Sequence, residues 1–309
     1  MNTIGICICT FRRTALLQEL LTACALLHLP EGWTVAVFVV DNDDQKSARP
    51  AVLQAAALGG IAVHYDVEPV QNIALSRNRV TGNALAHGCS LLALIDDDEL
   101  PGPDWLVDLH QGLVAHDCSG VLGPVLPRFD SPPPAWMVRS GFLRRTFESP
   151  GTPLPWAKTR TGNVLFRASV LDGEPRPFDP AFGRSGGEDL DFFKRMIDKG
   201  HRFVGVNHGA VQEFIPRERA RVSHLLNRAY LQGNTNIVLE KKYGAGKLNQ
   251  FKMSGKSLSA ILTYSALLPF LPLLAPSRRT RIGAGLFFHI GRLRRLLSTG
   301  VNLSRAEFH

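Results

Sequence analysis

Continuous apolar runs, separated by segments of helical periodicity, recur along the first half of the chain. The runs lie at residues 4–9, 34–40, 61–65 and 91–95, and helical patterns lie at 14–27, at 73–87 and from Pro101 onward. A run that is apolar at every position is buried on both faces, as are the strands of a parallel sheet covered by helices. The alternation therefore predicts an α/β fold with a two-sided, mainly parallel sheet.

Polar residues follow three of these apolar runs directly. Thr10 ends the first, Asp41 ends the second, and Asp96, Asp97 and Asp98 end the run at 91–95. In open parallel sheets, ligands bind beyond the carboxyl ends of the strands. We therefore expect these side chains to gather at one edge and to form the binding site.

The three consecutive aspartates carry the most chemical information. Adjacent carboxylates repel one another, so such a run at a strand end favours a compensating cation. Oxygen ligands at Asp96 and Asp98 suit Mg²⁺ or Mn²⁺, which keep waters and bind substrate phosphates. The alternative is a solvated acidic turn that caps the next helix.

A second candidate site begins at the glycine-rich stretch 183–187. It delivers Glu188 and Asp189 to the start of a helix predicted to run to Lys199, where the helix dipole favours an ionised carboxylate. Such a carboxylate is suited to general base catalysis, although simple helix capping is the alternative. Thr161, Gly162 and Asn163 add small polar groups after a Pro-, Arg- and aromatic-rich stretch at 129–156, which we expect to be a long loop.

The charge is divided unevenly along the chain. Residues 217–309 contain 16 Lys and Arg against three acidic residues, whereas residues 1–216 contain 19 Lys and Arg against 24 Asp and Glu. This asymmetry is typical of an acidic domain that bears the site, joined to a segment that faces an anionic partner. We therefore expect a catalytic domain at 1–216 and a mainly helical, basic segment at 217–309.

Six motifs occur together in a characteristic order and spacing: Cys9-Thr-Phe-Arg-Arg13, Val39-Val-Asp-Asn-Asp43, Ala74-Leu-Ser-Arg-Asn78, Ile95-Asp-Asp-Asp-Glu99, Thr161-Gly-Asn163 and Gly186-Gly-Glu-Asp189. Over residues 3–235 the chain thereby resembles the family 2 glycosyltransferases, and most of all the bacterial members that build exopolysaccharide or glycolipid on a lipid carrier. The resemblance implies a GT-A fold, a Rossmann-like nucleotide-sugar-binding sheet flanked by helices. It also implies an inverting transfer that depends on Mn²⁺ or Mg²⁺.

The resemblance also implies roles for individual residues. Asp98 would be the direct metal ligand, with Asp96 shared between the metal and the ribose, and Asp189 would be the general base. The donor nucleotide would be bound by Thr10, Arg12, Asp41, Arg77 and Asp96, and the acceptor by Asn163 and Glu188. The physical chemistry agrees, because a metal neutralises the departing diphosphate and one carboxylate is enough to activate the acceptor hydroxyl.

The C-terminal segment contains 21 uncharged residues, 257–277. As one helix this stretch would be roughly 31 Å long, close to the thickness of a bilayer core. Pro269 and Pro272 interrupt it, and both flanks are basic, so a simple span is disfavoured. We expect a re-entrant or interfacial hairpin with Lys and Arg at anionic head groups; a buried helical pair is the alternative.

The functional expectation is an inverting, metal-dependent hexosyltransferase at the cytoplasmic face of the inner membrane. It would move one sugar from a nucleotide-sugar, in the first place a UDP-sugar, to a lipid-linked or saccharide acceptor in surface polysaccharide or glycolipid synthesis. A stretch matching the family's R-x-x-x-x-G element, Arg228 to Gly233, stands where processive members carry Q-x-x-R-W, which favours single-sugar addition.

Two alternatives remain open at this point. The same fold would serve with a GDP-, dTDP- or CDP-sugar and a soluble acceptor. A basic membrane- or nucleic-acid-binding protein without catalysis is the alternative of another class. Nucleic acid is not an expected partner, because the C-terminal charges flank an apolar run rather than alternating with stacking aromatic residues.

Overall fold

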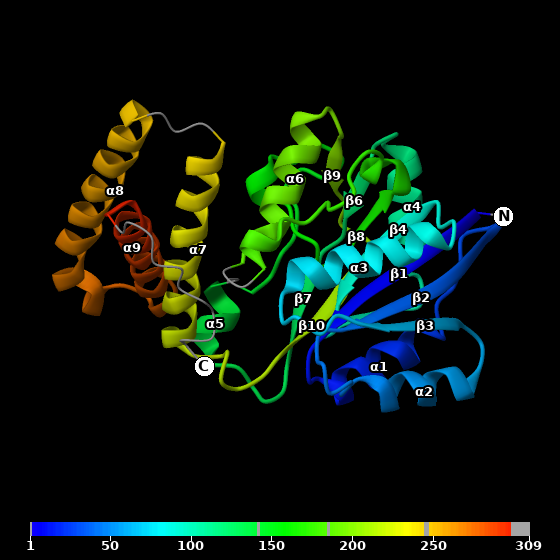
Figure 1. Cartoon of the computed structure of the whole chain (residues 1–309). Helices are drawn as coiled ribbons and strands as arrows, with labels where there is room; N and C mark the ends of the chain where they lie inside the picture. The colour runs from blue at the N-terminus through cyan, green and yellow to red at the C-terminus, as the bar shows by residue number, and fades with distance from the viewer. Residues whose placement is uncertain (1, 141–142, 184–185, 244–246, 298–309) are drawn as a thin grey trace. The chain divides into compact units, whose positions relative to one another are not determined.

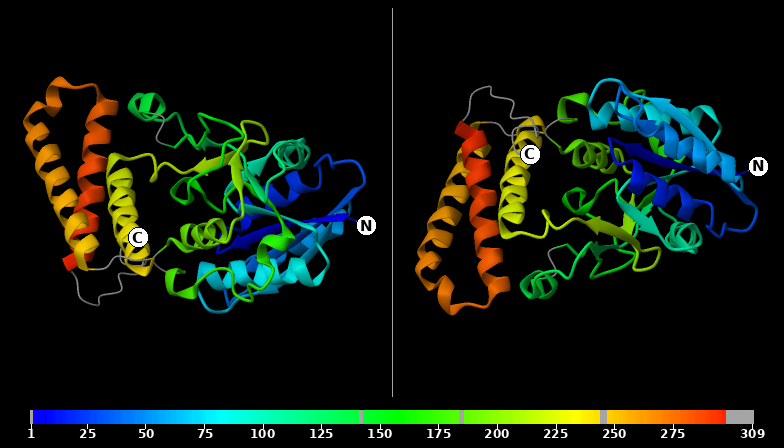
Figure 2. Two further views of the ribbon diagram at one scale, coloured as in Figure 1. Left: turned by 90° about the horizontal axis from the view of Figure 1, so that it is seen from above. Right: turned by 90° about the horizontal axis from the view of Figure 1, so that it is seen from below.

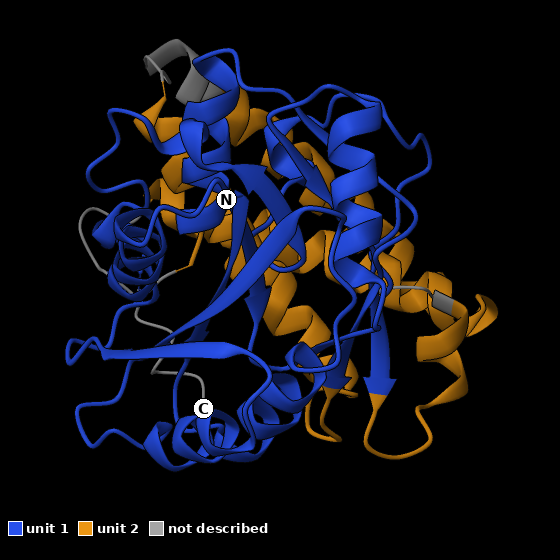
Figure 3. Cartoon of the chain, turned by 90° about the vertical axis from the view of Figure 1, so that its right-hand side faces the viewer, with its two compact units in different colours: residues 1–128, 144–184, 188–214 blue, residues 129–143, 185–187, 215–309 orange. Residues whose placement is uncertain are grey.

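The computed structural model describes residues 2–140, 143–183, 186–243 and 247–297. These residues form two compact units. The first unit comprises residues 1–128, 144–184 and 188–214, and the second comprises 129–143, 185–187 and 215–309 (Figure 3).

The main sheet of the first unit has seven strands in the order β3-β2-β1-β4-β8-β6-β9 (Figure 1). Their bounds are β1 Asn2–Thr10, β2 Trp33–Asp41, β3 Ala62–Val67, β4 Leu91–Asp96, β6 Gly120–Leu122, β8 Val164–Arg167 and β9 Phe203–Gly205. β1 is parallel to both β2 and β4, β2 is parallel to β3, and β8 runs antiparallel to β4 and β6. The predicted α/β class is therefore confirmed, with β8 as an antiparallel insertion.

Both faces of this sheet are covered by helices, as the apolar runs require. Ile4, Ile6 and Ile8 belong to the core on one face, whereas Cys7 belongs to the core on the other. The first core includes residues of α1 (Thr14–Cys24), α2 (Arg49–Leu58) and α4 (Trp105–Ala115); the second includes residues of α3 (Ile73–Ala86) and α6 (Glu188–Asp198). Figure 1 shows α1 and α2 on one side of the sheet and α3 on the other.

A small second sheet fixes the chain that follows the aspartates. It has the order β5-β10-β7, with bounds β5 Glu99–Pro101, β7 Val125–Phe129 and β10 Val211–Ile215. Glu99 lies opposite Glu213, and the Phe214 amide donates a 2.7 Å hydrogen bond to the Asp98 carbonyl. These bonds hold the segment that carries Asp98 and Glu99 to β10.

The second unit is helical. Its elements are α5 (Ala135–Ser140), α7 (Val222–Lys242), α8 (Lys247–Leu267), the 3₁₀ helix η4 (Leu268–Leu273) and α9 (Pro276–Leu297). α9 packs between α7 and α8 (Figure 2). At the crossing of α7 and α9, a Cβ on Gly233 would lie 2.0 Å from the Phe288 carbonyl oxygen, and one on Gly291 would lie 2.2 Å from the Tyr230 carbonyl oxygen. The glycine of the R-x-x-x-x-G element thus permits close helix packing.

A buried arginine ties the three long helices together. Arg292 of α9 donates to Glu240 of α7 at 3.1 Å and to the Ser257 hydroxyl of α8 at 3.1 Å, and it also bonds Asn236. Arg292 is buried and its charge is paired, which is the condition for an ionised group away from water.

Three features of the structure differ from the sequence expectations. Helix α2 was not expected, since its alanine-rich sequence gives little apolar periodicity. The stretch at 129–156, expected to be a long loop, contains β7 residue Phe129 and helix α5, and Met137 and Leu143 are buried. Residues 129–143 belong to the second unit, although we expected them in the first domain. Three short 3₁₀ helices complete the first unit: η1 (Trp156–Lys158), η2 (Ala168–Leu171) and η3 (Pro180–Phe182).

Candidate active site

The strand register brings the expected polar residues to one edge of the sheet. Thr10 at the end of β1 pairs with Asp41 at the end of β2, and Cys9 pairs with Asp96 at the end of β4. Three polar residues distant in sequence therefore end neighbouring parallel strands, at the edge where α/β sheets bind their ligands.

Arg77 of α3 joins this edge to the start of α6. Its Nη1 bonds the Glu188 carboxylate, and its Nη2 lies 3.4 Å from Asp96 Oδ1. Arg77 and Glu188 are both buried, and Glu188 Oε2 has no hydrogen-bond partner among the described residues. Asp96, Arg77 and Glu188, all predicted for the site, thus form one charged group, called the Arg77 group below. Glu188 Oε2 is a buried acceptor atom within it.

Asp189 stands next to this group in the first turn of α6. Its Oδ1 accepts a 2.8 Å hydrogen bond from the Leu190 amide. The pKa of Asp189 is raised to about 6, chiefly by burial and then by the Glu188 charge, against the opposing effect of Arg77. A carboxylate with a pKa near neutrality is ionised at pH 7 and still binds a proton readily, as a general base must.

The carboxylates that follow β4 have different partners. Asp97 is buried, with one oxygen accepting from the Thr10 hydroxyl at 2.8 Å and the other from Arg13 Nη1 at 2.8 Å. The same Arg13 nitrogen lies 3.0 Å from Asp98 Oδ2. The Asp96 side chain is 45% exposed, far more than its two neighbours, so it is the one most open to solvent.

Two residues expected to bind the nucleotide are engaged within the fold. Asp41 is fully buried and accepts from the Ala48 amide at 2.7 Å and the Tyr65 hydroxyl at 3.0 Å. Arg12 is directed to Asp43, with contacts at 3.2 and 3.3 Å. Its backbone has a φ of 53°, a left-handed conformation that few non-glycine residues adopt.

Asn163, expected to bind the acceptor, is not joined to the Arg77 group. It is fully buried, its Oδ1 accepts from the Trp105 indole, and its Nδ2 donates to the carbonyls of Pro124 and Gly209. These bonds span four segments of the first unit. In this structure Asn163 braces the fold around the site.

Its neighbour Gly162 permits a close approach of backbone to the acidic edge. A Cβ at Gly162 would lie 2.7 Å from Glu99 Oε1 and 3.0 Å from Asp96 Oδ2. Any larger residue would displace one of these carboxylates.

Sequence reasoning missed Glu99 and Arg13. Glu99 is buried, its Oε2 accepts from the Asp96 amide at 3.1 Å, and its Oε1 has no hydrogen-bond partner among the described residues. Burial and the Asp96 charge raise the pKa of Glu99 well above its usual range. Each is the last residue of a motif named above, so its position beside Arg12 or beside the aspartates was the available signal.

The carboxylates at this edge are of the ligand type that a divalent cation takes. No group of three or more His, Cys, Asp or Glu side chains able to enclose an ion occurs in the described ranges. Two carboxylates, Asp96 and Asp98, remain, and Mg²⁺ is commonly bound by one or two carboxylates together with waters and substrate phosphates. Arg13 lies between Asp97 and Asp98, so this edge of the sheet already contains a positively charged group.

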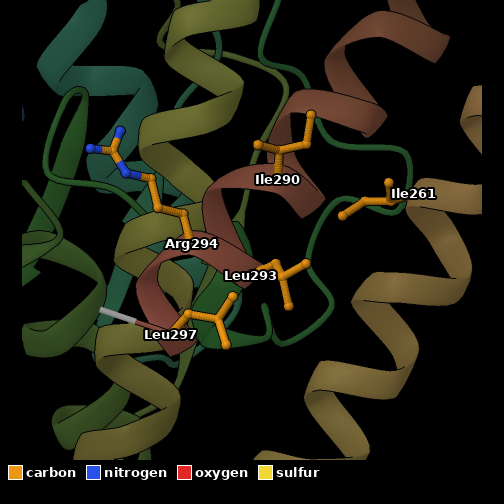
Figure 4. A pocket seen from close by; sticks show the side chains of 5 residues that line it. All are labelled: Ile261, Ile290, Leu293, Arg294 and Leu297. Carbon is orange, nitrogen blue, oxygen red and sulfur yellow. The ribbon is translucent and has the colours of Figure 1, made fainter. Parts of the chain in front are cut away.

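The second unit contains a separate surface groove that does not involve these residues. It lies between α8 and α9, has a volume of about 490 Å³, and is lined by Ile261, Ile290, Leu293, Arg294 and Leu297 (Figure 4). Arg294 points away from Ile261, and its guanidinium donates to the Tyr230 hydroxyl of α7 at 2.7 Å. The floor of this groove is therefore apolar.

A family model described as glycosyl transferase family 2 matches residues 5–172, more than half of the chain. The chain belongs to glycosyl transferase family 2. This confirms the resemblance drawn from the motifs, and with it the prediction that the protein is a glycosyltransferase. Every residue discussed above from Thr10 to Asn163 lies within the matched segment, whereas Glu188 and Asp189 lie beyond it.

A curated relative extends the likeness to nearly the whole glycosyltransferase. The succinoglycan biosynthesis protein ExoM of Rhizobium meliloti (strain 1021) is 32% identical over 302 residues, which cover 95% of this chain and 93% of ExoM.

Solved structures confirm the GT-A fold class. The mannosyltransferase PcManGT from Pyrobaculum calidifontis, solved with GDP-Man and Mn²⁺, matches with a TM-score of 0.60 at 17% identity over 95% of this chain and 87% of its own. Staphylococcus aureus TarS 1–349, solved with UDP, matches with a TM-score of 0.54 at 14% identity over 94% and 90%. At these identities the likeness concerns the fold.

Proposed function

We propose that this glycosyltransferase moves one sugar from a nucleotide-sugar, in the first place a UDP-sugar, to a hydroxyl of a lipid-linked saccharide, with inversion at the anomeric carbon. The observation that carries the proposal is the Arg77 group. It joins Asp96 at the strand edge to Glu188, the residue before the carboxylate whose pKa is raised to about 6. This contact supports a donor position and an acceptor position that are adjacent.

In the proposed reaction, Asp189 takes the proton from the acceptor hydroxyl. The hydroxyl oxygen bonds to the anomeric carbon as the bond from that carbon to the diphosphate breaks, and the nucleoside diphosphate leaves with the electron pair. Glu188 would orient the acceptor through its unpaired Oε2, while Arg77 holds Glu188 and Asp96 in place. Attack from the face opposite the leaving group inverts the configuration at the anomeric carbon.

Asp96 and Asp98 would hold Mn²⁺ or Mg²⁺. When bound, such a cation supplies charge neutralisation for the departing diphosphate. Thr10 and Asp41 would act on the nucleotide indirectly, Thr10 by fixing Asp97 and Asp41 by fixing the loop at 42–48. Arg12 would border the same loop through Asp43.

The acceptor class is proposed from the relative and from the second unit. ExoM is named for succinoglycan biosynthesis, so we propose a surface polysaccharide repeat unit as the acceptor. One segment of the described chain, Lys252–Leu273, is long and apolar enough to cross a membrane; an 18-residue window of it has a mean hydropathy of 1.2, and 6% of that window is buried. Length and composition alone are weak support for a span.

The exposure of this segment supports an interfacial position at the cytoplasmic membrane face. Leu262 is 64% exposed and Leu273 is 81% exposed. Basic residues flank them on both sides, namely Lys252, Lys256, Arg278, Arg279 and Arg281, all of which are solvent-accessible. Apolar side chains beside exposed cations are the composition of helices that lie in an anionic membrane surface.

A nucleotide panel tests the proposed function. Thermal unfolding of the full-length protein would be followed with UDP, GDP, dTDP and CDP, each with and without Mn²⁺. We expect one of them to raise the melting temperature by several degrees only when Mn²⁺ is present, because a ligand of the native state at 100 times its Kd adds about 2.7 kcal/mol. If a nucleotide other than UDP acts, the donor assignment changes; if none acts, the donor-site proposal is wrong.

A further inference from the structure

Arg13 carries a charge that the proposed reaction does not yet use. Its Nη1 lies between two carboxylates, 2.8 Å from Asp97 Oδ1 and 3.0 Å from Asp98 Oδ2. This contact places the guanidinium directly on the carboxylate assigned to the metal. One cation of the chain therefore occupies the surroundings that a divalent cation needs.

The two carboxylates hold Arg13 in different ways. Asp97 is buried, and its second oxygen is bonded to Thr10, so Asp97 is a fixed anchor. Asp98 is the carboxylate that would bind the metal in place of Arg13. Its segment is held independently by the Phe214 amide on the Asp98 carbonyl, so the carboxylate can exchange partners without loss of that backbone contact.

The rest of the Arg13 side chain is available to a ligand. Its Nε and Nη2 make no hydrogen bond to any residue that the structure describes, and the side chain is 38% exposed. Arg12, which we expected to bind the nucleotide, instead uses both Nε and Nη2 on Asp43. An arginine with unoccupied donors in a planar arrangement is suited to bidentate phosphate recognition.

We propose that Arg13 is a donor-binding residue with two partners: it is the counterion of Asp98 in the empty enzyme, and it binds the donor diphosphate when a divalent cation occupies Asp98. The inference rests on the proposed function. Throughout the exchange, Asp97 keeps the guanidinium at the edge of the sheet.

Charge balance gives the reason. A divalent cation alone adds two positive charges beside Asp98, so it competes with Arg13. A divalent cation together with the diphosphate of a nucleotide-sugar adds no net charge, because the two phosphates carry two negative charges. The site therefore requires the charge of Arg13 equally in the empty and the loaded state, and only its partner changes.

This account predicts effects of opposite sign for two probes. In Arg13→Ala, we expect Mn²⁺ alone to bind at least about threefold more tightly, since the competing cation is gone. UDP in the presence of saturating Mn²⁺ should bind about tenfold to hundredfold more weakly, since charged hydrogen bonds to phosphate are lost. Mn²⁺ binding would be followed by electron paramagnetic resonance and UDP binding by calorimetry, both on the full-length protein.

Two further variants make the result interpretable. Arg13→Lys keeps a charge but lacks the planar fork, so Mn²⁺ binding should stay near wild type while UDP binding weakens severalfold. Arg79→Ala is the matched control, because the Arg79 side chain is 39% exposed, close to the 38% of Arg13, and also bridges two carboxylates, Asp66 and Glu68, in the first unit. It should leave both affinities unchanged.

The outcomes separate this inference from the proposed function. If Arg13→Ala weakens Mn²⁺ and UDP in parallel, Arg13 only shapes the carboxylates, and the inference is wrong while the donor site stands. If Arg13→Ala behaves as Arg79→Ala does, the inference is also wrong. Wild-type protein that binds neither Mn²⁺ nor UDP, GDP, dTDP or CDP would overturn the proposed function and this inference together.

Discussion

The strand-end site of the first unit and the α8–η4 segment of the second unit differ in which kind of side chain is buried and which is exposed. At the strand ends of the first, charged groups such as Arg77 and Glu188 are buried in contact with each other, whereas along α8 and η4 of the second, apolar residues such as Leu262 and Leu273 are exposed. Burying ionised groups costs free energy unless they are paired, and exposing apolar surface forgoes the gain of burial. Each unit thus carries a local arrangement that folding alone does not explain. The first points to chemistry and the second to a partner.

The largest expected effect concerns the acidic edge. Asp98→Ala removes the carboxylate assigned to the metal, so we expect turnover to fall by at least about 10³. The fold should be preserved, because Arg13 keeps its contact with Asp97. Steady-state kinetics with circular dichroism would measure both quantities.

Asp198→Ala is the control for this variant, since Asp198 is an exposed carboxylate on α6 whose partner is Lys194. It should keep wild-type turnover. A folded Asp98→Ala enzyme with near wild-type kcat in the presence of chelator would contradict the metal assignment. The charged groups of the first unit would then need another explanation than metal-dependent catalysis.

A smaller effect is expected at the apolar surface of the second unit. Full-length protein should sediment with anionic vesicles, and high salt should release only part of it, because apolar burial persists after charge screening. Replacing Phe270 and Leu273 together with Glu should lower the bound fraction by about tenfold.

Leu58→Glu is the matched control, because Leu58 is 70% exposed on α2 in the first unit. It should bind vesicles as the wild type does. Wild-type protein that ignores vesicles would instead favour a soluble saccharide acceptor and a protein partner for the α8–η4–α9 surface.

How far the sequence predicts this molecule follows from particular residues. Thr10, Asp41 and Asp96 were placed correctly at one edge because strand ends in a parallel sheet align by register. Arg12 and Arg13 could not be told apart, because the left-handed backbone at Arg12 is a local conformation with no signature in its residue type. The structural role of Asn163 could not be predicted, because its hydrogen bonds to Pro124, Gly209 and Trp105 exist only after the tertiary fold forms.

The second unit shows a different limit. The prolines and basic flanks predicted a re-entrant or interfacial hairpin. Helices α8 and α9 follow one another across η4 and pack together, which fits both that hairpin and the alternative helical pair, so the membrane position stays a prediction. The close crossing at Gly233 and the buried Arg292 were beyond reach, because each depends on the packing of helices more than 30 residues apart. That an anionic membrane surface covers the exposed leucines stays a prediction.

The smallest expected effect is on stability. The pKa of Asp189 is raised to about 6 in the folded protein, above the value near 3.9 of an exposed aspartate. The stability gained by keeping this carboxyl protonated is therefore present below about pH 4 and is lost as the pH rises through 6. At pH 8 the free energy of unfolding of Asp189→Asn should exceed that of the wild type by about 1–2 kcal/mol, and at pH 4 the two free energies should be equal.

Urea unfolding at the two pH values measures this difference. A variant less stable than wild type at pH 8 would show that the ionised carboxylate contributes favourable contacts to the fold, which would remove the reason to regard it as a base.

The central claim is that catalysis belongs to the group formed by Asp96, Arg77, Glu188 and Asp189. The most direct test is to measure kcat and donor affinity for Asp189→Asn, which keeps the shape of the side chain and removes its ability to accept a proton. The account predicts that kcat falls by about 10²–10⁴ while the Kd of the nucleotide-sugar is nearly unchanged. A collapse of donor binding, with turnover of bound donor preserved, would contradict it.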